Sequence, residues 1–116
     1  MTLNLLEEPR VFGVKGHELK DIGKIFLNNN ELVSFKTKSG KEYDFVAKDW
    51  GFYASPSVNS RLIKEGFKTA LVVNENEQVY VMVVESDKMD IFHKYLADNQ
   101  NSKIICWLDN FFTGVF

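Results

Sequence analysis

Three apolar runs in the second half of the chain constrain the fold most. Within residues 68–74, 79–85 and 103–108, the stretches 70–73, 79–84 and 104–108 are apolar at odd and even positions alike. Successive side chains of a strand point to opposite faces, so a strand with one solvated face alternates apolar and polar residues. These runs therefore predict strands that are covered on both sides. The polar residues 75–78 predict a hairpin turn between the first two strands.

Two helices are predicted around these strands. Ser55 followed by Pro56 is typical of a helix start, with Ser55 as the N-cap and Pro56 at the first helical position. The first helix is therefore expected over 56–65, with Gly66 as its left-handed cap. The second helix is expected over 87–98. Its apolar stripe consists of Met89, Phe92 and Leu96.

The first half of the chain predicts further strands after residues 1–9, which are expected to form an irregular lead-in or an edge. The strands are expected at residues 10–14, 22–27, 32–38 and 41–48.

The turn between the last two of these strands can be assigned from the pattern of side chains. A two-residue loop, Ser39-Gly40, would set Phe35 opposite Asp44 and mix apolar and charged groups on one face. A three-residue loop over 38–40 sets Phe35 opposite Tyr43 instead. It also places Gly40 at the left-handed position that such loops require. The three-residue loop is predicted.

The order of elements predicts the α+β class, with a mostly antiparallel sheet, two helices and amino-terminal β-hairpins. From residue 41 the order is strand, helix, strand, strand, helix, strand, which is the split βαβ pattern of ferredoxin-like folds. The strand at 32–38 is also expected to pair with the first of these strands. Either it displaces the last strand at an edge of the sheet, or the sheet is a different mixed meander. A length of 116 residues predicts a single domain over 1–116.

Composition and charge narrow the classes of partner. A net charge of −2 argues against a nucleic-acid-binding protein, because such proteins usually carry a basic face. No apolar run approaches the roughly 20 residues that cross a membrane, and the amino terminus lacks the pattern of a signal peptide. The single cysteine excludes an intramolecular disulfide. We therefore expect a soluble cytoplasmic protein that binds neither nucleic acid nor membrane.

No signature of a metal site, a cofactor site or a catalytic site is present. Two histidines far apart and one cysteine offer none of the usual ligand spacings. The chain has no P-loop, dinucleotide fingerprint or nucleophile elbow. His93 is expected on a helix surface, and Cys106 is expected to behave as a small apolar residue within a strand. We expect no metal, no cofactor and no assigned catalytic residue.

The segment from Trp50 to Arg61 is the most site-like part of the sequence. It is expected to join a strand to a helix N-terminus, where free amides attract anions. Its candidate ligand-binding residues are Trp50, Tyr53, Ser57, Asn59 and Arg61. Aromatic rings beside such polar groups suit a small anionic or sugar-like ligand. The alternative is purely structural: Ser55 caps the helix, Trp50 and Phe52 fill the core, and Arg61 pairs with a surface carboxylate such as Glu65 four residues on.

A resemblance to a group of small proteins is carried by residues 50–62, 66–71 and 80–84. These three runs are similar to small bacterial proteins encoded among surface-polysaccharide and sugar-nucleotide genes. The resemblance covers about residues 30–109 and implies a cytoplasmic accessory role in glycan synthesis. It supplies no catalytic residues.

Three functional hypotheses follow from these observations. The leading one is a non-catalytic binding or accessory module that holds its ligand at residues 50–61. The second is a protein-interaction module or homodimer, suggested by the two-faced strands and the apolar tail at 111–116. The third is a small enzyme that uses Tyr53, Asn59 and Arg61 in acid–base or electrostatic catalysis.

Overall fold

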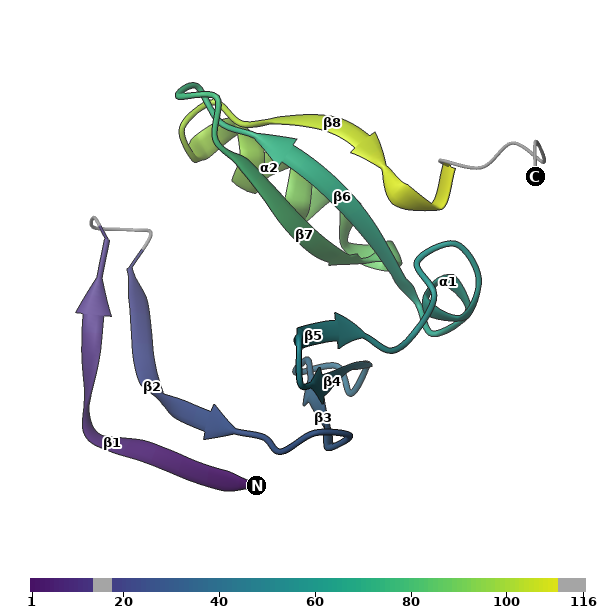
Figure 1. The fold of residues 1–116 in the computed structure, drawn as a ribbon. Helices are drawn as coiled ribbons and strands as arrows, with labels where there is room; N and C mark the ends of the chain where they lie inside the picture. Colours follow the sequence, from purple (N-terminus) through teal and green to yellow (C-terminus); the bar gives the residue numbers. More distant parts are fainter. Residues whose placement is uncertain (14–17, 111–116) are drawn as a thin grey trace. The chain divides into compact units, whose positions relative to one another are not determined.

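The computed structural model describes residues 1–13 and 18–110, so the apolar tail lies outside the described residues. The chain has the predicted α+β class (Figure 1). Its strands and helices are β1 (Thr2–Phe12), β2 (Leu19–Phe26), β3 (Leu32–Lys36), β4 (Glu42–Lys48), β5 (Gly51–Ala54), α1 (Arg61–Lys64), β6 (Phe67–Val73), β7 (Val79–Glu85), η1 (Ser86–Lys88), α2 (Met89–Asp98), β8 (Lys103–Trp107) and η2 (Leu108–Asn110). None of the helices in these ranges is long and apolar enough to cross a membrane.

Contacts between residues divide the chain into two compact units. The first consists of Met1–Ser34 and Asp44–Ala54, and the second consists of Phe35–Tyr43 and the residues from Ser55 onward. The division passes through the β3–β4 hairpin, whose tip belongs to the second unit. Each unit is described separately below, and the single domain stays a prediction.

The first unit begins with an antiparallel hairpin of β1 and β2. Leu3 pairs with Ile25 and Leu5 with Gly23, and the register then shifts before Arg10. Residues 2–9 therefore belong to a strand of a two-stranded sheet, which agrees with the predicted edge and not with an irregular lead-in. Pro9 lies in the stretch where the register shifts, which is where a strand tolerates proline because no ladder hydrogen bond is lost.

The strands β3, β4 and β5 form an antiparallel sheet in that order. The predicted three-residue loop between β3 and β4 is confirmed. The amide of Thr37 donates to the carbonyl of Lys41 at 2.9 Å, and the amide of Gly40 donates to the carbonyl of Thr37 at 2.9 Å. Gly40 has a φ of 92°, the left-handed conformation that this loop requires. Strand β5 was not predicted.

The second unit contains an antiparallel sheet of the order β7-β6-β8. The hairpin predicted around 75–78 is confirmed, with Leu71 opposite Val81. The predicted ferredoxin-like arrangement is not confirmed. It would place the strand at 41–48 in this sheet, whereas β4 pairs with β3 and β5 instead. Both edges of β4 are therefore paired with the strands that precede and follow it in sequence.

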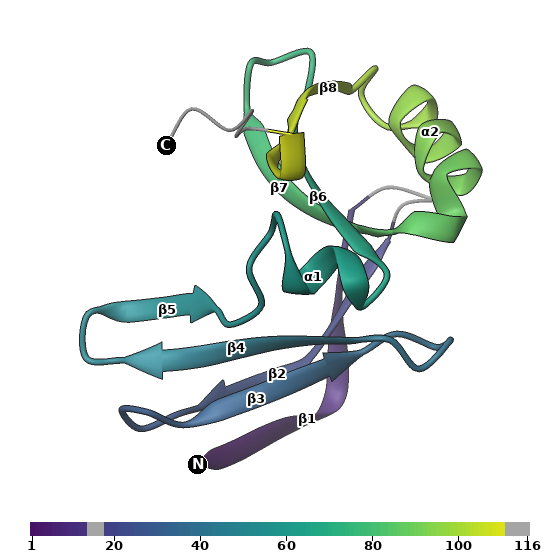
Figure 2. The ribbon, with the colours of Figure 1, turned by 90° about the vertical axis from the view of Figure 1, so that its right-hand side faces the viewer.

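Helix α2 covers one face of this sheet and forms the main core with it (Figure 2). Residues at even positions of β6 and β7 point towards the helix, and Phe92 and Leu96 from α2 meet them as predicted. The buried residues of this core are Ala70, Val72, Val84, Phe92 and Leu96. Burial of these side chains contributes roughly 1.5–3 kcal/mol for each of the larger ones.

The prediction of strands covered on both faces holds for β6 alone. On its second face Phe67 and Thr69 are buried, and the ring of Tyr43 lies 6.1 Å from that of Phe67. On β7, however, Val81 is 66% exposed, and Ile105 of β8 is 53% exposed. Strands β7 and β8 are the outer strands of the described sheet. Fewer residues therefore cover the face of these strands that points away from α2. Ile105 falls where the β8 register shifts.

The first helix differs from its prediction. Only Arg61–Lys64 are helical, and Ser60 occupies the N-cap position. Ser55 caps nothing, because the backbone from Ser55 to Ser60 makes turns that bury Pro56 instead of starting a helix at it. Gly66 follows the helix with a φ of 92°, which confirms its predicted role as a left-handed cap.

Candidate functional site

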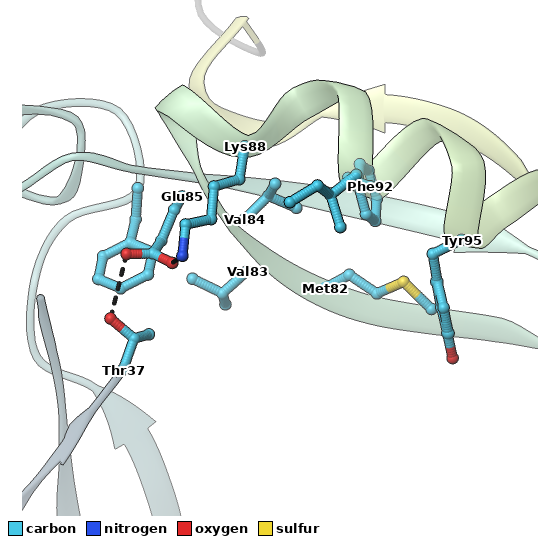
Figure 3. Close-up of a pocket in the computed structure, with 10 residues that line it drawn as sticks. Thr37, Met82, Val83, Val84, Glu85, Lys88, Phe92 and Tyr95 are labelled. Carbon is cyan, nitrogen blue, oxygen red and sulfur yellow. Dashed lines mark hydrogen bonds and ion pairs between the residues drawn. The ribbon is translucent and has the colours of Figure 1, made fainter. Parts of the chain in front are cut away.

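A pocket of about 370 Å³ lies in the second unit between the hairpin tip, β7 and α2 (Figure 3). We call it the α2–β7 pocket. Most of its lining is apolar, and one end is polar or charged. The apolar lining consists of Phe67, Met82, Val83, Val84, Ile91, Phe92 and Tyr95. The polar end consists of Thr37, Glu85 and Lys88.

The spacing of residues on α2 forms one wall of the pocket. Ile91 and Tyr95 are four residues apart, so they lie on the same side of the helix. They are 68% and 41% exposed, whereas the adjacent Phe92 is 9% exposed and belongs to the core. Val84 of β7 is also buried. The pocket therefore has fixed core residues at its base and exposed apolar residues along its side.

Glu85 holds the polar end together. Its carboxylate is 9% exposed and accepts hydrogen bonds from the hydroxyls of Ser39 and Thr37, the latter at 3.1 Å (Figure 3). Lys88 Nζ lies 3.2 Å from its second oxygen, and Lys41 Nζ lies 3.8 Å from the first. The hydrogen bond from Ser39, helped by Lys88 and Thr37, lowers the pKa of Glu85. Glu85 is therefore held as a carboxylate.

Asp87 completes this charged cluster. Lys41 Nζ donates to it at 2.9 Å, and this hydrogen bond lowers the pKa of Asp87. Two ammonium groups thus face two carboxylates, and the cluster is neutral overall. Because Glu85 already accepts several hydrogen bonds, it anchors the hairpin tip to β7 and is a poor candidate for a general base.

The sequence contains no local sign of this cluster. Glu85 ends an apolar strand, and its hydroxyl donors Thr37 and Ser39 lie 48 and 46 positions earlier. Only the tertiary structure brings them together. The lysine at position 88 is the one partner close enough in sequence to have been paired with Glu85 in advance.

Trp50 and Tyr53, from the predicted site, belong to the first unit. Their rings are stacked, with centroids 6.1 Å apart and planes inclined by 20°. Trp50 directly precedes β5 and Tyr53 lies within it, and the two residues are 72% and 42% exposed. Phe52 is 67% exposed, so the prediction that Trp50 and Phe52 fill the core is wrong. The Trp50–Tyr53 pair forms an exposed aromatic platform of the kind on which the flat face of a ligand can stack.

Ser57, Asn59 and Arg61 belong to the second unit and are exposed. The hydroxyl of Ser57 accepts a hydrogen bond from the amide of Arg61 at 2.9 Å. Arg61 Nε lies 3.1 Å from Glu65, which confirms the ion pair of the structural alternative. These three residues do not line the α2–β7 pocket. Ser57 and Arg61 thus make local contacts that stabilise the helix start.

His93 and Cys106 are the remaining side chains considered as candidates for catalysis or metal binding. His93 is exposed and lies beside Phe92, and Cys106 is a free, partly buried thiol within β8. In the part of the chain that the structure describes, no three side chains of His, Cys, Asp or Glu gather as metal ligands.

No protein-family model, curated protein or solved structure matches this chain. The α2–β7 pocket and the Trp50–Tyr53 stack are therefore the two features of the molecule that bear on its function.

Proposed function

We propose that this protein is a non-catalytic binding module and that the α2–β7 pocket receives an apolar ligand or the apolar part of one. The supporting observation is the combination of size and lining. Ligand pockets usually measure about 300–1,000 Å³ and are mostly apolar with a few polar groups, and the α2–β7 pocket, at about 370 Å³, has both properties. Because its polar end is neutral overall, it favours no strongly charged ligand.

Binding of small apolar probes tests this proposal. Indole and short alkylbenzenes should shift the methyl NMR signals of Met82, Val83 and Ile91. The variant Ile91→Lys should abolish these shifts, because it places an ammonium group in the pocket wall. Ile91 is 68% exposed, so the variant should fold normally.

The matched control is Ile105→Lys, which changes an isoleucine on β8 that is 53% exposed. It should bind the probes as the parent protein does. Absence of shifts in the parent, or equal shifts in Ile91→Lys, would contradict the proposal.

The Trp50–Tyr53 stack supports a second binding surface, for a small anionic or sugar-like ligand. What supports it is the exposure of both rings, which are 72% and 42% exposed. Thermal-shift screening against sugar nucleotides, sugar phosphates and sialic-like acids tests it. Stabilisation should disappear in Trp50→Ala and weaken in Tyr53→Ala, because both rings of the stack would contact the ligand. The idea fails if the whole panel leaves the melting temperature unchanged.

A protein-interaction or homodimer role is the alternative function, and the β1–β2 hairpin favours it. One face of this hairpin carries Leu3, Leu5 and Ile25, which are 54%, 61% and 39% exposed. Two-stranded hairpins are marginally stable alone, and contiguous exposed apolar side chains usually mark an interface. The supported partner is a second copy of the chain or another protein.

Light scattering at low micromolar concentration tests this alternative. A dimer should dissociate in Leu5→Lys but persist in Ile22→Lys, because Ile22 is 61% exposed on the opposite face of the hairpin. A clean monomer would argue against self-association.

We further propose that the protein acts in the cytoplasm as an accessory component of glycan synthesis. The support for this role is the resemblance carried by residues 50–62, 66–71 and 80–84. A binding role is favoured over catalysis by Tyr53, Asn59 and Arg61, because the Arg61 guanidinium already pairs with Glu65.

A further inference from the structure

A second, polar pocket lies in the second unit, where two turns meet the end of α2. It has a volume of about 190 Å³. The turns are the one between β6 and β7 and the one between α2 and β8. Its polar lining consists of Asn74, Tyr80, Tyr95, Asn99, Gln100 and Ser102. We call it the amide pocket. Every side chain in this set is uncharged at neutral pH, so the pocket is suited to a neutral ligand with many hydrogen-bonding groups.

Asn74 holds the two turns together and fixes the shape of the amide pocket. Asn74 is 7% exposed, and its side-chain oxygen accepts hydrogen bonds from the backbone amides of Asn76 and Gln78. Its nitrogen donates to Gln78 at 2.9 Å and to Gln100 at 2.8 Å. These four hydrogen bonds use the full capacity of the Asn74 amide. Asn74 therefore positions Gln100 and keeps no group for a ligand.

The backbone at the α2–β8 turn is held in a conformation that is unusual for its residues. Gln100 and Asn101 have φ values of 52° and 50°. Non-glycine residues seldom adopt this left-handed conformation, and they persist in it where the surrounding structure imposes it. The carbonyl of Gln100 accepts the amide of Glu75 at 3.2 Å. The turn thus presents an amide side chain at a position where glycine would present none.

Several polar atoms in the amide pocket keep hydrogen-bonding capacity. Asn99 donates through Nδ2 to the Tyr95 hydroxyl at 2.9 Å, and Gln100 accepts through Oε1. Within the described residues, no hydrogen bond uses Asn99 Oδ1 or Gln100 Nε2. Ser102 Oγ donates to the Asn99 carbonyl at 2.7 Å and can still accept. The pocket therefore offers acceptors and a donor close together.

Tyrosine rings supply the remaining element of recognition. Tyr80 and Tyr95, which are 46% and 41% exposed, line the pocket together with Met82. A sugar ring presents hydroxyls that both donate and accept, and an apolar C–H face that packs on aromatic rings. We propose that the amide pocket binds a neutral polyhydroxylated ligand, such as an uncharged sugar unit. This proposal is independent of the apolar ligand proposed for the α2–β7 pocket.

An NMR titration of the whole protein tests the proposal. Glucose and N-acetylglucosamine should shift the amide signals of residues 74–80 and 99–102, with dissociation constants in the millimolar range. Glucose 6-phosphate should bind more weakly, because the pocket offers no charged partner for a phosphate. The variant Asn99→Leu, which keeps the shape of the side chain and removes its polar atoms, should lose the effect. Tyr80→Leu, on an exposed edge, should weaken it several-fold.

Two control variants separate this site from the others. Ile91→Lys should keep the sugar-induced shifts while losing apolar probes, and Trp50→Ala should also keep them. The proposal is overturned by the absence of shifts at these residues, by shifts that survive in Asn99→Leu, or by stronger binding of the phosphorylated sugar. If Asn99→Leu does not fold, Tyr80→Leu decides between the outcomes in the same way.

Discussion

Glu85 shows how a single carboxylate can be kept at the end of an apolar strand. A carboxylate withdrawn from water is costly unless hydrogen bonds and opposite charges replace its hydration. Here two hydroxyls and two ammonium groups do so. The same contacts connect the hairpin tip, residues 35–43, to the end of β7, across 48 positions from Thr37 and 46 from Ser39. Glu85 therefore has a structural role over a long range in sequence.

We predict that Glu85→Gln lowers stability at neutral pH and that this difference disappears in acid. The folded-state pKa of Glu85 is lowered from 4.5, so its stabilising contribution is present above that value and is lost as the pH falls through the folded value. Urea denaturation of both proteins at neutral pH and at about pH 3 measures the effect.

The matched control is Glu42→Gln, which removes an exposed carboxylate paired with Lys36 at 3.1 Å. It should change stability little at either pH, because exposed ion pairs contribute little. An equal loss in the two variants, or a Glu85→Gln defect that persists in acid, would show that the buried carboxylate is not the stabilising group.

Residues that interact over short distances in sequence were the ones that could be predicted. The pair of Arg61 and Glu65 followed from helix geometry alone. The partners of Glu85 could not be predicted, because no local rule connects a hydroxyl in a loop with a strand end far along the chain. The same limit applies to Asn74 and Gln100, which belong to separate turns.

At the scale of elements, the sequence predicts those whose signal is strong and repeated. Strands β6, β7 and β8 and helix α2 lie close to their predicted bounds, because each has an apolar run or stripe bounded by turn residues. Strand β5 has only four residues, too few for a periodic signal. The start of the first helix was misplaced because serine next to proline also favours a turn, and burial of Pro56 stabilises that turn here.

We predict that Ser57→Ala costs about 1 kcal/mol of stability, which is the net contribution of a typical intramolecular hydrogen bond. Its hydroxyl accepts the amide of Arg61 at 2.9 Å. Ser55→Ala, at the position predicted from sequence, should cost much less. Equilibrium denaturation of the two variants makes the comparison, and the reverse order would restore the sequence-based cap.

We predict that Gly40→Ala costs about 1 kcal/mol, because alanine is strained in the left-handed conformation. A side chain at this position would meet no other atom within 4 Å, so the cost should come from the backbone alone. Gly40→Asn should recover part of the loss, since asparagine tolerates this conformation. Denaturation midpoints test the order; similar stability of Gly40→Ala and the parent would contradict the loop geometry.

Strand order was the least predictable property of the elements. The order of strands and helices from residue 41 is compatible with a ferredoxin-like sheet. The sheet that forms depends on which other strands pair with the two edges of each strand. The short loop at 38–40 and the tight connection to β5 provide both neighbours of β4 locally. Local hairpins close with little loss of chain entropy, which favours them over more distant pairings.

At the scale of the whole molecule, the two units raise the question of how many cooperative transitions the chain has. Each unit contains one tryptophan, Trp50 in the first and Trp107 in the second. We predict that both report the same unfolding midpoint, as the single domain over 1–116 requires. Labelling with 5-fluorotryptophan resolves the two ¹⁹F NMR signals during urea titration.

The assignment of the two signals comes from Trp50→Phe and Trp107→Phe. Trp107 contacts Phe92, with ring centroids 5.9 Å apart, so its replacement should also lower stability, whereas replacement of the exposed Trp50 should not. Two separate midpoints would show that the units unfold independently and that the chain has two domains.

The pairing of β1 with β2 also limits how this protein can change over evolutionary time. A side chain on Gly23 would place its first carbon 2.3 Å from the backbone oxygen of Asn4, which no rotamer can relieve. Substitutions at position 23 can therefore survive only if β1 shifts or shortens at the same time. Among homologous chains, a residue other than glycine here should coincide with an insertion or deletion near residues 5–10, where the register already shifts.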